Sequence, residues 1–70
     1  MKKTLKELRT ENKKTVAEVA KALGVSPSAI TNYESGIRRI SLEHVLILSE
    51  LYEESAEEII NAQLNSLLTQ

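Results

Sequence analysis

Side chains able to do covalent or metal chemistry are scarce in this chain of 70 residues. Cysteine and aspartate are both missing, and His44 is the only histidine. A catalytic nucleophile needs a base beside it, and a metal ion needs a cluster of several ligands. The glutamates, which we expect on exposed helical faces, cannot supply either arrangement alone. The inventory therefore predicts a protein that is not an enzyme and that carries no metal or cofactor, with His44 at the surface.

The cationic side chains, in contrast, are concentrated in one half of the sequence. All nine Lys and Arg residues lie between Lys2 and Arg39, and with four Glu residues in 1–40 they give that part a balance of +5. Residues 41–70 hold six Glu and neither Lys nor Arg, a balance of −6, so the net charge of −1 hides two opposed halves. A basic half attracts the phosphate backbone of nucleic acid. The alternative is that short helices merely carry uneven solvated faces.

The elements that must position these charges are predicted to be five helices in a single domain, residues 1–70. Leu, Ala, Glu and Lys favour helix, and the one Pro and two Gly residues lie close together. Thr15 with Glu18 has the spacing of a capping box, and Ser26 before Pro27 is typical of a helix start. We expect an all-α fold with short connections and helices over about 4–12, 15–24, 26–36, 41–52 and 55–69.

No segment is long enough to cross a membrane. The longest apolar run, Val45–Leu48, is far shorter than the roughly 20 residues that a membrane span needs. The opening Met-Lys-Lys resembles the start of a secretion signal, but no apolar segment follows it. We therefore expect a cytoplasmic protein.

The segment over residues 15–36 fits the geometry of a helix-turn-helix. Ala20 is small where two helices would cross closely, and Gly24, four positions later, can adopt a left-handed turn conformation. The second helix must enter the major groove of DNA as a fixed probe, so apolar contacts must hold the pair rigid. The residues at the matching places are Val19, Leu23, Val25, Ile30 and Tyr33.

This run, Thr15–Gly36, resembles the lambda-repressor-like, Cro-type family of DNA-binding proteins, also called the XRE family. The likeness rests on a Thr-capped helix, the Gly24-Val-Ser turn and the later pattern Ile30-x-x-Tyr-Glu-x-Gly. The flanking segments Leu5–Arg9, Ser41–Leu48 and Ser55–Ile60 fit as well, so the resemblance covers about residues 4–60. It implies a compact five-helix domain that regulates transcription, with repression favoured, by binding a two-fold operator in double-stranded DNA as a homodimer.

The resemblance also implies which residues reach base edges: Pro27, Ser28, Ala29 and Asn32, on the solvent-facing side of the third helix. Asn32 is the strongest candidate, because Asn can pair with adenine through two hydrogen bonds. The alternative is that Asn32 is simply a solvated helix residue. Pro27 and Ala29 have no hydrogen-bonding side chain, so we expect DNA shape to carry much of the specificity.

Phosphate contacts are expected in the two loops that flank the recognition helix: Lys14, Thr15 and Val16 on one side, Arg38 and Arg39 on the other. The helix beginning at Thr15 adds a backbone N–H and its positive dipole end. The family usually has Gln where this chain has Val16. Val16 cannot make the side-chain hydrogen bonds of Gln, so we expect it to pack; the alternative is that it touches a thymine methyl.

Two further family positions are predicted to be structural. Arg9 and Glu34 occupy places that form an ion pair between the first and third helices in this family, an interpretation we favour over a direct DNA contact by Arg9. Tyr33 falls on the inward stripe with Ile30, which favours core packing over stacking on a base.

Apolar residues of the C-terminal half predict a dimer interface around the helix over about 55–69. They offer more apolar surface than a monomer of this size should easily cover. The alternative is that this helix folds back onto its own core. The candidate interface residues are Ile47, Leu51, Ile59, Ile60, Leu64, Leu67 and Leu68.

A protein-interaction module is the competing functional hypothesis. The same fold would then bind a partner protein, as an antitoxin does when it binds both DNA and its toxin. The salt dependence of duplex binding separates the two hypotheses, because Lys and Arg contacts to phosphate weaken steeply with salt.

Overall fold

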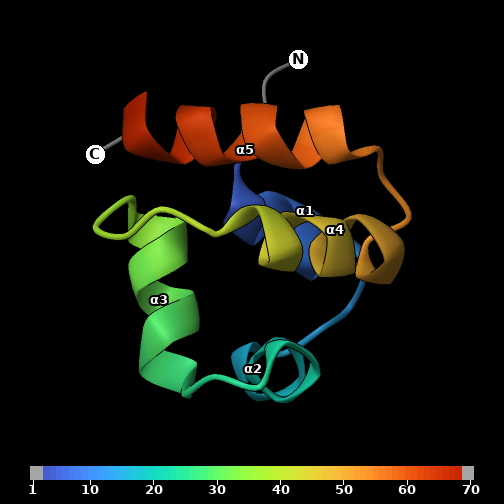
Figure 1. Cartoon of the computed structure of the whole chain (residues 1–70), viewed down its shortest axis with the longest axis vertical. Helices are drawn as coiled ribbons and strands as arrows, with labels where there is room; N and C mark the ends of the chain where they lie inside the picture. Colours follow the sequence, from blue (N-terminus) through green and yellow to red (C-terminus); the bar gives the residue numbers. More distant parts are fainter. Residues whose placement is uncertain (1–2, 69–70) are drawn as a thin grey trace.

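Five helices connected by short turns make up the computed structural model, which describes residues 3–68 (Figure 1). No strand occurs within those residues, and the predicted all-α fold with five helices is confirmed. The expected end of the last helix, near residue 69, lies outside the described residues. The helices are α1 (Leu5–Glu11), α2 (Val16–Leu23), α3 (Pro27–Ser35), α4 (Leu42–Leu51) and α5 (Ala56–Leu68).

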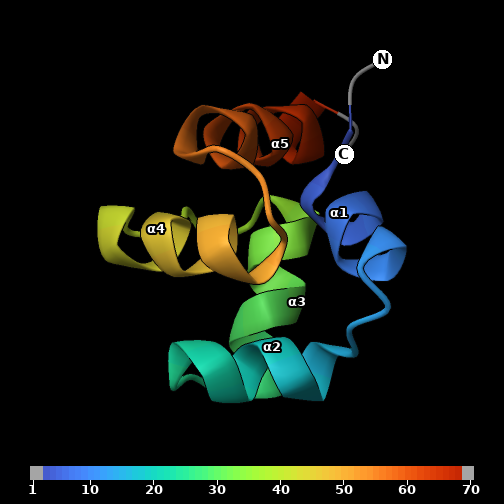
Figure 2. The same cartoon turned by 90° about the vertical axis from the view of Figure 1, so that its right-hand side faces the viewer.

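The third helix stands across the others and links the two ends of the molecule. α5 lies along one end and α2 at the other, with α1 and α4 between them (Figures 1 and 2). α3 packs against α1, α2 and α5. Contacts with three neighbouring helices hold α3 in a fixed orientation, which a helix that enters the major groove of DNA requires.

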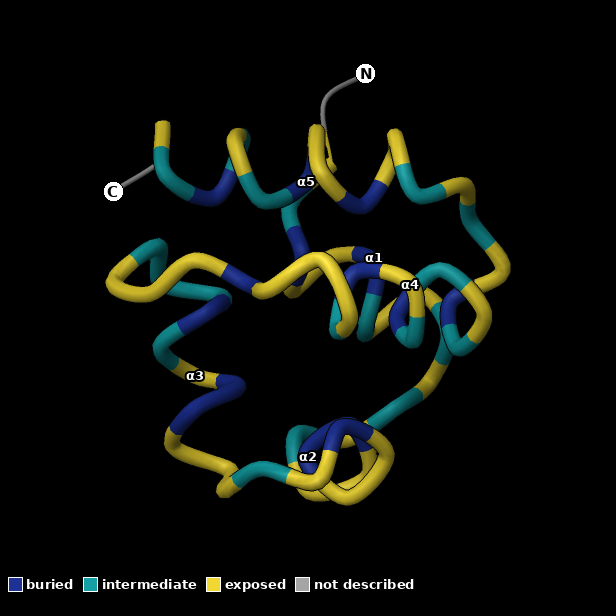
Figure 3. The backbone as a smooth tube through the Cα atoms, viewed as in Figure 1, coloured by how far each residue is buried: buried dark blue, intermediate teal, exposed yellow. Residues whose placement is uncertain are grey.

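The hydrophobic core lies where these helices face one another, and every helix contributes to it (Figure 3). Tyr33 is buried in it, as predicted. Close packing of aliphatic side chains from five short helices supplies most of the stabilisation in a chain of this size. The buried apolar residues are Leu5, Leu8, Val19, Ala20, Leu23, Ala29, Ile30, Tyr33, Ile40, Val45, Leu48, Tyr52, Ile59 and Ala62.

Helix starts follow the predicted caps. The Thr15 hydroxyl accepts a hydrogen bond from the Glu18 N–H at 3.1 Å, and the Glu18 carboxylate accepts one from the Thr15 N–H at 2.8 Å. Ser26 caps α3, with Pro27 in its first turn. A cap of this kind stabilises a helix by about 1 kcal/mol.

The ends of α1 to α4 all close in the same way, through a residue in the left-handed conformation. These residues are Lys13 (φ 57°), Gly24 (φ 71°), Gly36 (φ 80°) and Glu53 (φ 53°). The N–H of the next residue then reaches the carbonyl five positions back, at 3.0–3.1 Å in each case. Glycine adopts this conformation freely, whereas any other residue is disfavoured by roughly 1–2 kcal/mol. The turns at Lys13 and Glu53 therefore contain local backbone strain.

Candidate nucleic-acid interface

The outer face of α3 carries short polar side chains. Pro27, Ser28 and Thr31 are exposed, and Asn32 is half-buried. Within the described part of the chain, the side-chain amide of Asn32 has no hydrogen-bond partner, so its donors and acceptor remain available for a base edge. Three of the four predicted base-contacting residues thus lie on an accessible surface.

Ala29 does not. We expected it to face solvent, and that expectation is wrong: Ala29 is only 8% exposed and belongs to the core. Positions 29 and 33 lie on the same side of a helix, and Tyr33 is buried on that side. Thr31 occupies the exposed face instead, three residues after Ser28. Its polar character and its spacing from Ser28 were the signal in the sequence that could have identified it.

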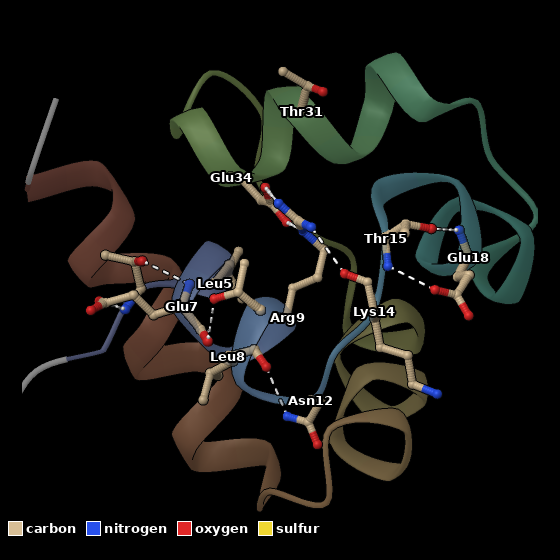
Figure 4. A network of polar contacts seen from close by, with 12 residues as sticks. Leu5, Glu7, Leu8, Arg9, Asn12, Lys14, Thr15, Glu18, Thr31 and Glu34 are labelled. Carbon is tan, nitrogen blue, oxygen red and sulfur yellow. Dashed lines mark hydrogen bonds and ion pairs between the residues drawn. The ribbon is translucent and has the colours of Figure 1, made fainter.

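The Arg9 guanidinium connects the Lys14 loop, one of the two loops predicted to contact phosphate, to α3 (Figure 4). Its Nε donates to Glu34 Oε2 at 2.7 Å and its Nη2 donates to Glu34 Oε1 at 3.3 Å, so the predicted ion pair between α1 and α3 is confirmed. Its Nη1 also donates to the Lys14 carbonyl at 3.0 Å. The hydrogen bonds to Glu34 raise the pKa of Arg9, which keeps the group charged. The Arg9 side chain therefore fixes the position of the Lys14 loop relative to α3.

At the start of α2, the cap occupies part of the predicted phosphate site. The N–H of Thr15, the residue that caps this helix, already donates to the Glu18 carboxylate. That hydrogen bond lowers the pKa of Glu18 and keeps a negative charge beside the helix end. Val16 packs partly buried against the core, as predicted. Lys14 therefore remains the main cationic candidate in this loop.

The second loop predicted to contact phosphate follows α3. Arg38 and Arg39 are both exposed in the turn between Gly36 and α4. Across residues 3–68, only Lys3 and Arg9 take part in ion pairs, so no described carboxylate neutralises the guanidinium groups of this turn. Unpaired cations on both sides of α3 match the arrangement that phosphate clamping needs.

An open hollow at the surface is lined by residues of α1, α2 and α3. It encloses about 310 Å³. Lys6, which the sequence analysis did not single out, contributes a cation at its edge. The lining residues are Lys6, Arg9, Val16, Thr31, Glu34 and Ser35.

The candidate dimer surface is smaller than predicted. Ile60, Leu64 and Leu68 are 41–76% exposed and recur every four residues, so they form one stripe along α5, here called the α5 stripe. Ile59 is 0% exposed, so the expectation that it offers apolar surface is wrong. Ile60, the next residue, lies on the outer face. Successive residues of a helix point about 100° apart, so Ile59 points into the core.

The remaining predicted interface residues are neither fully buried nor fully exposed. Ile47 and Leu51 are partly buried against the core, and Leu67 is half-buried on Gly36. A second apolar set, which the sequence analysis did not single out, is 54–72% exposed. It comprises Ile37, Leu42 and Leu46 and is here called the α4 set.

Little in the described chain suggests other chemistry. His44 is half-buried and places its ring edge-on to Tyr33, with centroids 6.3 Å apart, so the expectation of a fully surface residue is only partly met. Within residues 3–68, no group of three or more His, Cys, Asp or Glu side chains could hold a metal ion. No helix among them is both long and apolar enough to span a lipid bilayer.

The sequence is similar to those of known gene regulators. The helix-turn-helix family profile matches residues 5–59. The chain is 39% identical over 57 residues to an HTH-type transcriptional regulatory protein of Thermococcus kodakarensis, covering 81% of this chain and 18% of the relative. It is 34% identical over 59 residues to the HTH-type transcriptional regulator AnsR of Bacillus subtilis, covering 84% of this chain and 51% of AnsR. The chain thus spans about half the length of these relatives or less. No solved structure gives a significant match.

Proposed function

Because this chain belongs to the helix-turn-helix family, we propose that it is a sequence-specific regulator of transcription that represses by binding a two-fold DNA operator as a homodimer. The observation that carries the proposal is the arrangement around α3. Its polar face is open, its back is held by α1, α2 and α5, and unpaired cations lie on both flanks. A rigid helix with these surroundings suits insertion into the major groove.

In this docking, α3 lies in the groove and the two loops grip the backbone on either side. Ser28, Thr31 and Asn32 face the base edges, while Lys14 contacts phosphate on one flank. Arg38 and Arg39 contact phosphate on the other flank. The two loops set the register of the helix, and the short polar side chains read the sequence. Since few side chains can hydrogen-bond to bases, DNA shape contributes to the specificity as well.

The proposed dimer forms through the α5 stripe. Recognition helices on a two-fold operator lie about 34 Å apart. A protomer measures 27 × 23 × 22 Å, so two copies side by side can place their α3 helices at that separation. An isologous contact between two α5 stripes would cover Ile60, Leu64 and Leu68 at the same time.

Selection of bound sequences from a random duplex library tests the proposal. We expect a recovered motif with two-fold symmetry and half-sites about one helical turn apart. Asn32→Ala should weaken binding about tenfold and relax the preference at one base pair per half-site. Asn61→Ala removes the same side chain from an exposed position on α5 and serves as the control. Absence of both sequence enrichment and binding to random duplex would refute the DNA-binding proposal.

A second candidate function is the binding of a partner protein, as in an antitoxin. The α4 set favours it, because these exposed apolar side chains lie outside the proposed dimer surface. Salt titration separates the two functions. Binding of DNA through phosphate contacts weakens with a log–log slope of about −0.9 per phosphate neutralised, and a module that binds only protein has no such dependence on duplex.

A further inference from the structure

The C-terminal half of α5 supports the turn that carries the two unpaired arginines. The side-chain carbonyl Oε1 of Gln63 accepts a hydrogen bond from the Ile40 N–H, at the end of this turn. At its beginning, Gly36 lies directly against Leu67: a Cβ atom on Gly36 would meet Leu67 Cδ2 at 2.9 Å and Leu67 Cα at 3.2 Å. The turn passes beneath the end of α5 in Figure 1.

Arg38 and Arg39 lie between these two supports. The N–H groups of Ile37 and Arg38 donate to the Asn32 carbonyl at 3.0 and 3.3 Å, which fixes the first half of the turn to α3. The second half has no regular structure, and the Ile40 N–H donates to the Gln63 side chain. Loss of that bond leaves a mostly buried N–H without its partner and frees the backbone between the arginines and α4.

We propose that Gln63 is a positioning residue for the DNA backbone: through Ile40 it holds the turn in the conformation that presents Arg38 and Arg39 to phosphate. The inference rests on the proposed DNA-binding function. It goes beyond the family, because the matching region ends at residue 59 and Gln63 lies outside it. The extension of α5 thereby sets DNA affinity without touching DNA.

The chain supplies a matched control on the same helix. Asn65 is likewise bonded through its side-chain amide to a backbone group, but this amide donates, and its partner is the Lys3 carbonyl at 2.9 Å, away from the turn. Gln63 and Asn65 are both half-buried. Gln63→Met and Asn65→Leu therefore each remove one hydrogen bond between α5 and the backbone, and only the first affects the arginine turn.

The test measures duplex binding by the full chain against salt concentration, together with amide hydrogen exchange at Ile40. For Gln63→Met we expect an affinity about tenfold lower and a salt slope reduced by roughly 1 to 2 for each protomer bound, as one or two phosphate contacts per protomer are lost. Exchange at Ile40 should accelerate as well. Asn65→Leu should keep the wild-type salt slope and the wild-type exchange at Ile40.

Equal losses of affinity and slope in the two variants would overturn the inference, because α5 would then act only through overall stability. An unchanged salt slope in Gln63→Met, with wild-type protein binding normally, would overturn it and leave the proposed function intact. If wild-type protein itself fails to bind duplex, the proposed function fails and the positioning role fails with it. Oligomeric state measured on the same samples separates these effects from loss of the dimer.

Discussion

Replacing Arg9 by Met should destabilise the domain strongly, because it leaves the largely buried Glu34 carboxylate without its partner. Both side chains of the pair are only 11% exposed. Removing one partner of a buried ion pair costs about 3–5 kcal/mol. The remaining exposure to water places the expected loss near the lower end, about 3 kcal/mol. Since about 1 kcal/mol shifts the Tm of a domain this small by roughly 4–8 °C, the Tm should fall by roughly 12–24 °C.

The double variant Arg9→Met/Glu34→Met separates stability from positioning. Two apolar side chains of similar volume remove the uncompensated charge, so most of the lost stability should return. The Lys14 carbonyl, however, still lacks the hydrogen bond that it receives from Arg9 at 3.0 Å. We therefore expect a domain that is stable again but binds duplex more weakly than wild type.

Urea and thermal unfolding followed by circular dichroism measure the first effect, and duplex titration measures the second. The reasoning is refuted if Arg9→Met costs less than about 1 kcal/mol, the range of an exposed pair. It is also refuted if the double variant is no more stable than Arg9→Met alone. Recovery of full DNA affinity in the double variant would contradict the positioning role assigned to the contact with Lys14.

Three further predictions concern other parts of the molecule. Lys13→Gly should raise the free energy of unfolding by about 1 kcal/mol and Gly24→Ala should lower it by about as much, because both positions adopt the left-handed conformation. If urea unfolding shows that both substitutions change this free energy in the same direction, the reasoning is wrong. Leu64→Glu should dissociate the proposed dimer in analytical ultracentrifugation, whereas Leu46→Glu should not, and the reverse result would move the proposed interface to α4. Burial raises the pKa of Tyr52 above its usual value near 10, so the folded protein keeps a proton that the unfolded chain releases. Stability should therefore fall as the pH rises above about 10, and Tyr52→Phe should flatten this decline in urea midpoints measured at pH 9 and 11.

Local features were predictable from sequence because their causes lie within a few residues. The capping box of Thr15 and Glu18, the turn at Gly24 and the start of α3 at Ser26 each depend on short-range hydrogen bonds or backbone freedom. The Arg9–Glu34 pair spans 25 positions and was accessible only through the family resemblance.

Burial was less predictable where it depends on tertiary packing. Ala29 and Ile59 sit beside exposed positions in sequence, and the side of each helix that faces the core is set by neighbours far along the chain. A short helix gives too few turns to define that side to within one residue. The left-handed Lys13 also lacks a local signal, because the direction in which α2 must leave α1 imposes it.

The contacts of α5 with the beginning of the chain also bear on the order of folding. Ser66 Oγ accepts from the Leu5 N–H across 61 positions, and Asn65 reaches the Lys3 carbonyl across 62. Bringing together segments so far apart carries a large loop-closure entropy, whereas the α2–α3 pair forms from neighbours in sequence. We therefore expect α5 to dock last and to open first, detaching the N-terminal segment and the arginine turn in a single sub-global opening. Native-state hydrogen exchange would then report one shared opening free energy for Leu5 and Ile40, lower than that of the α2–α3 pair.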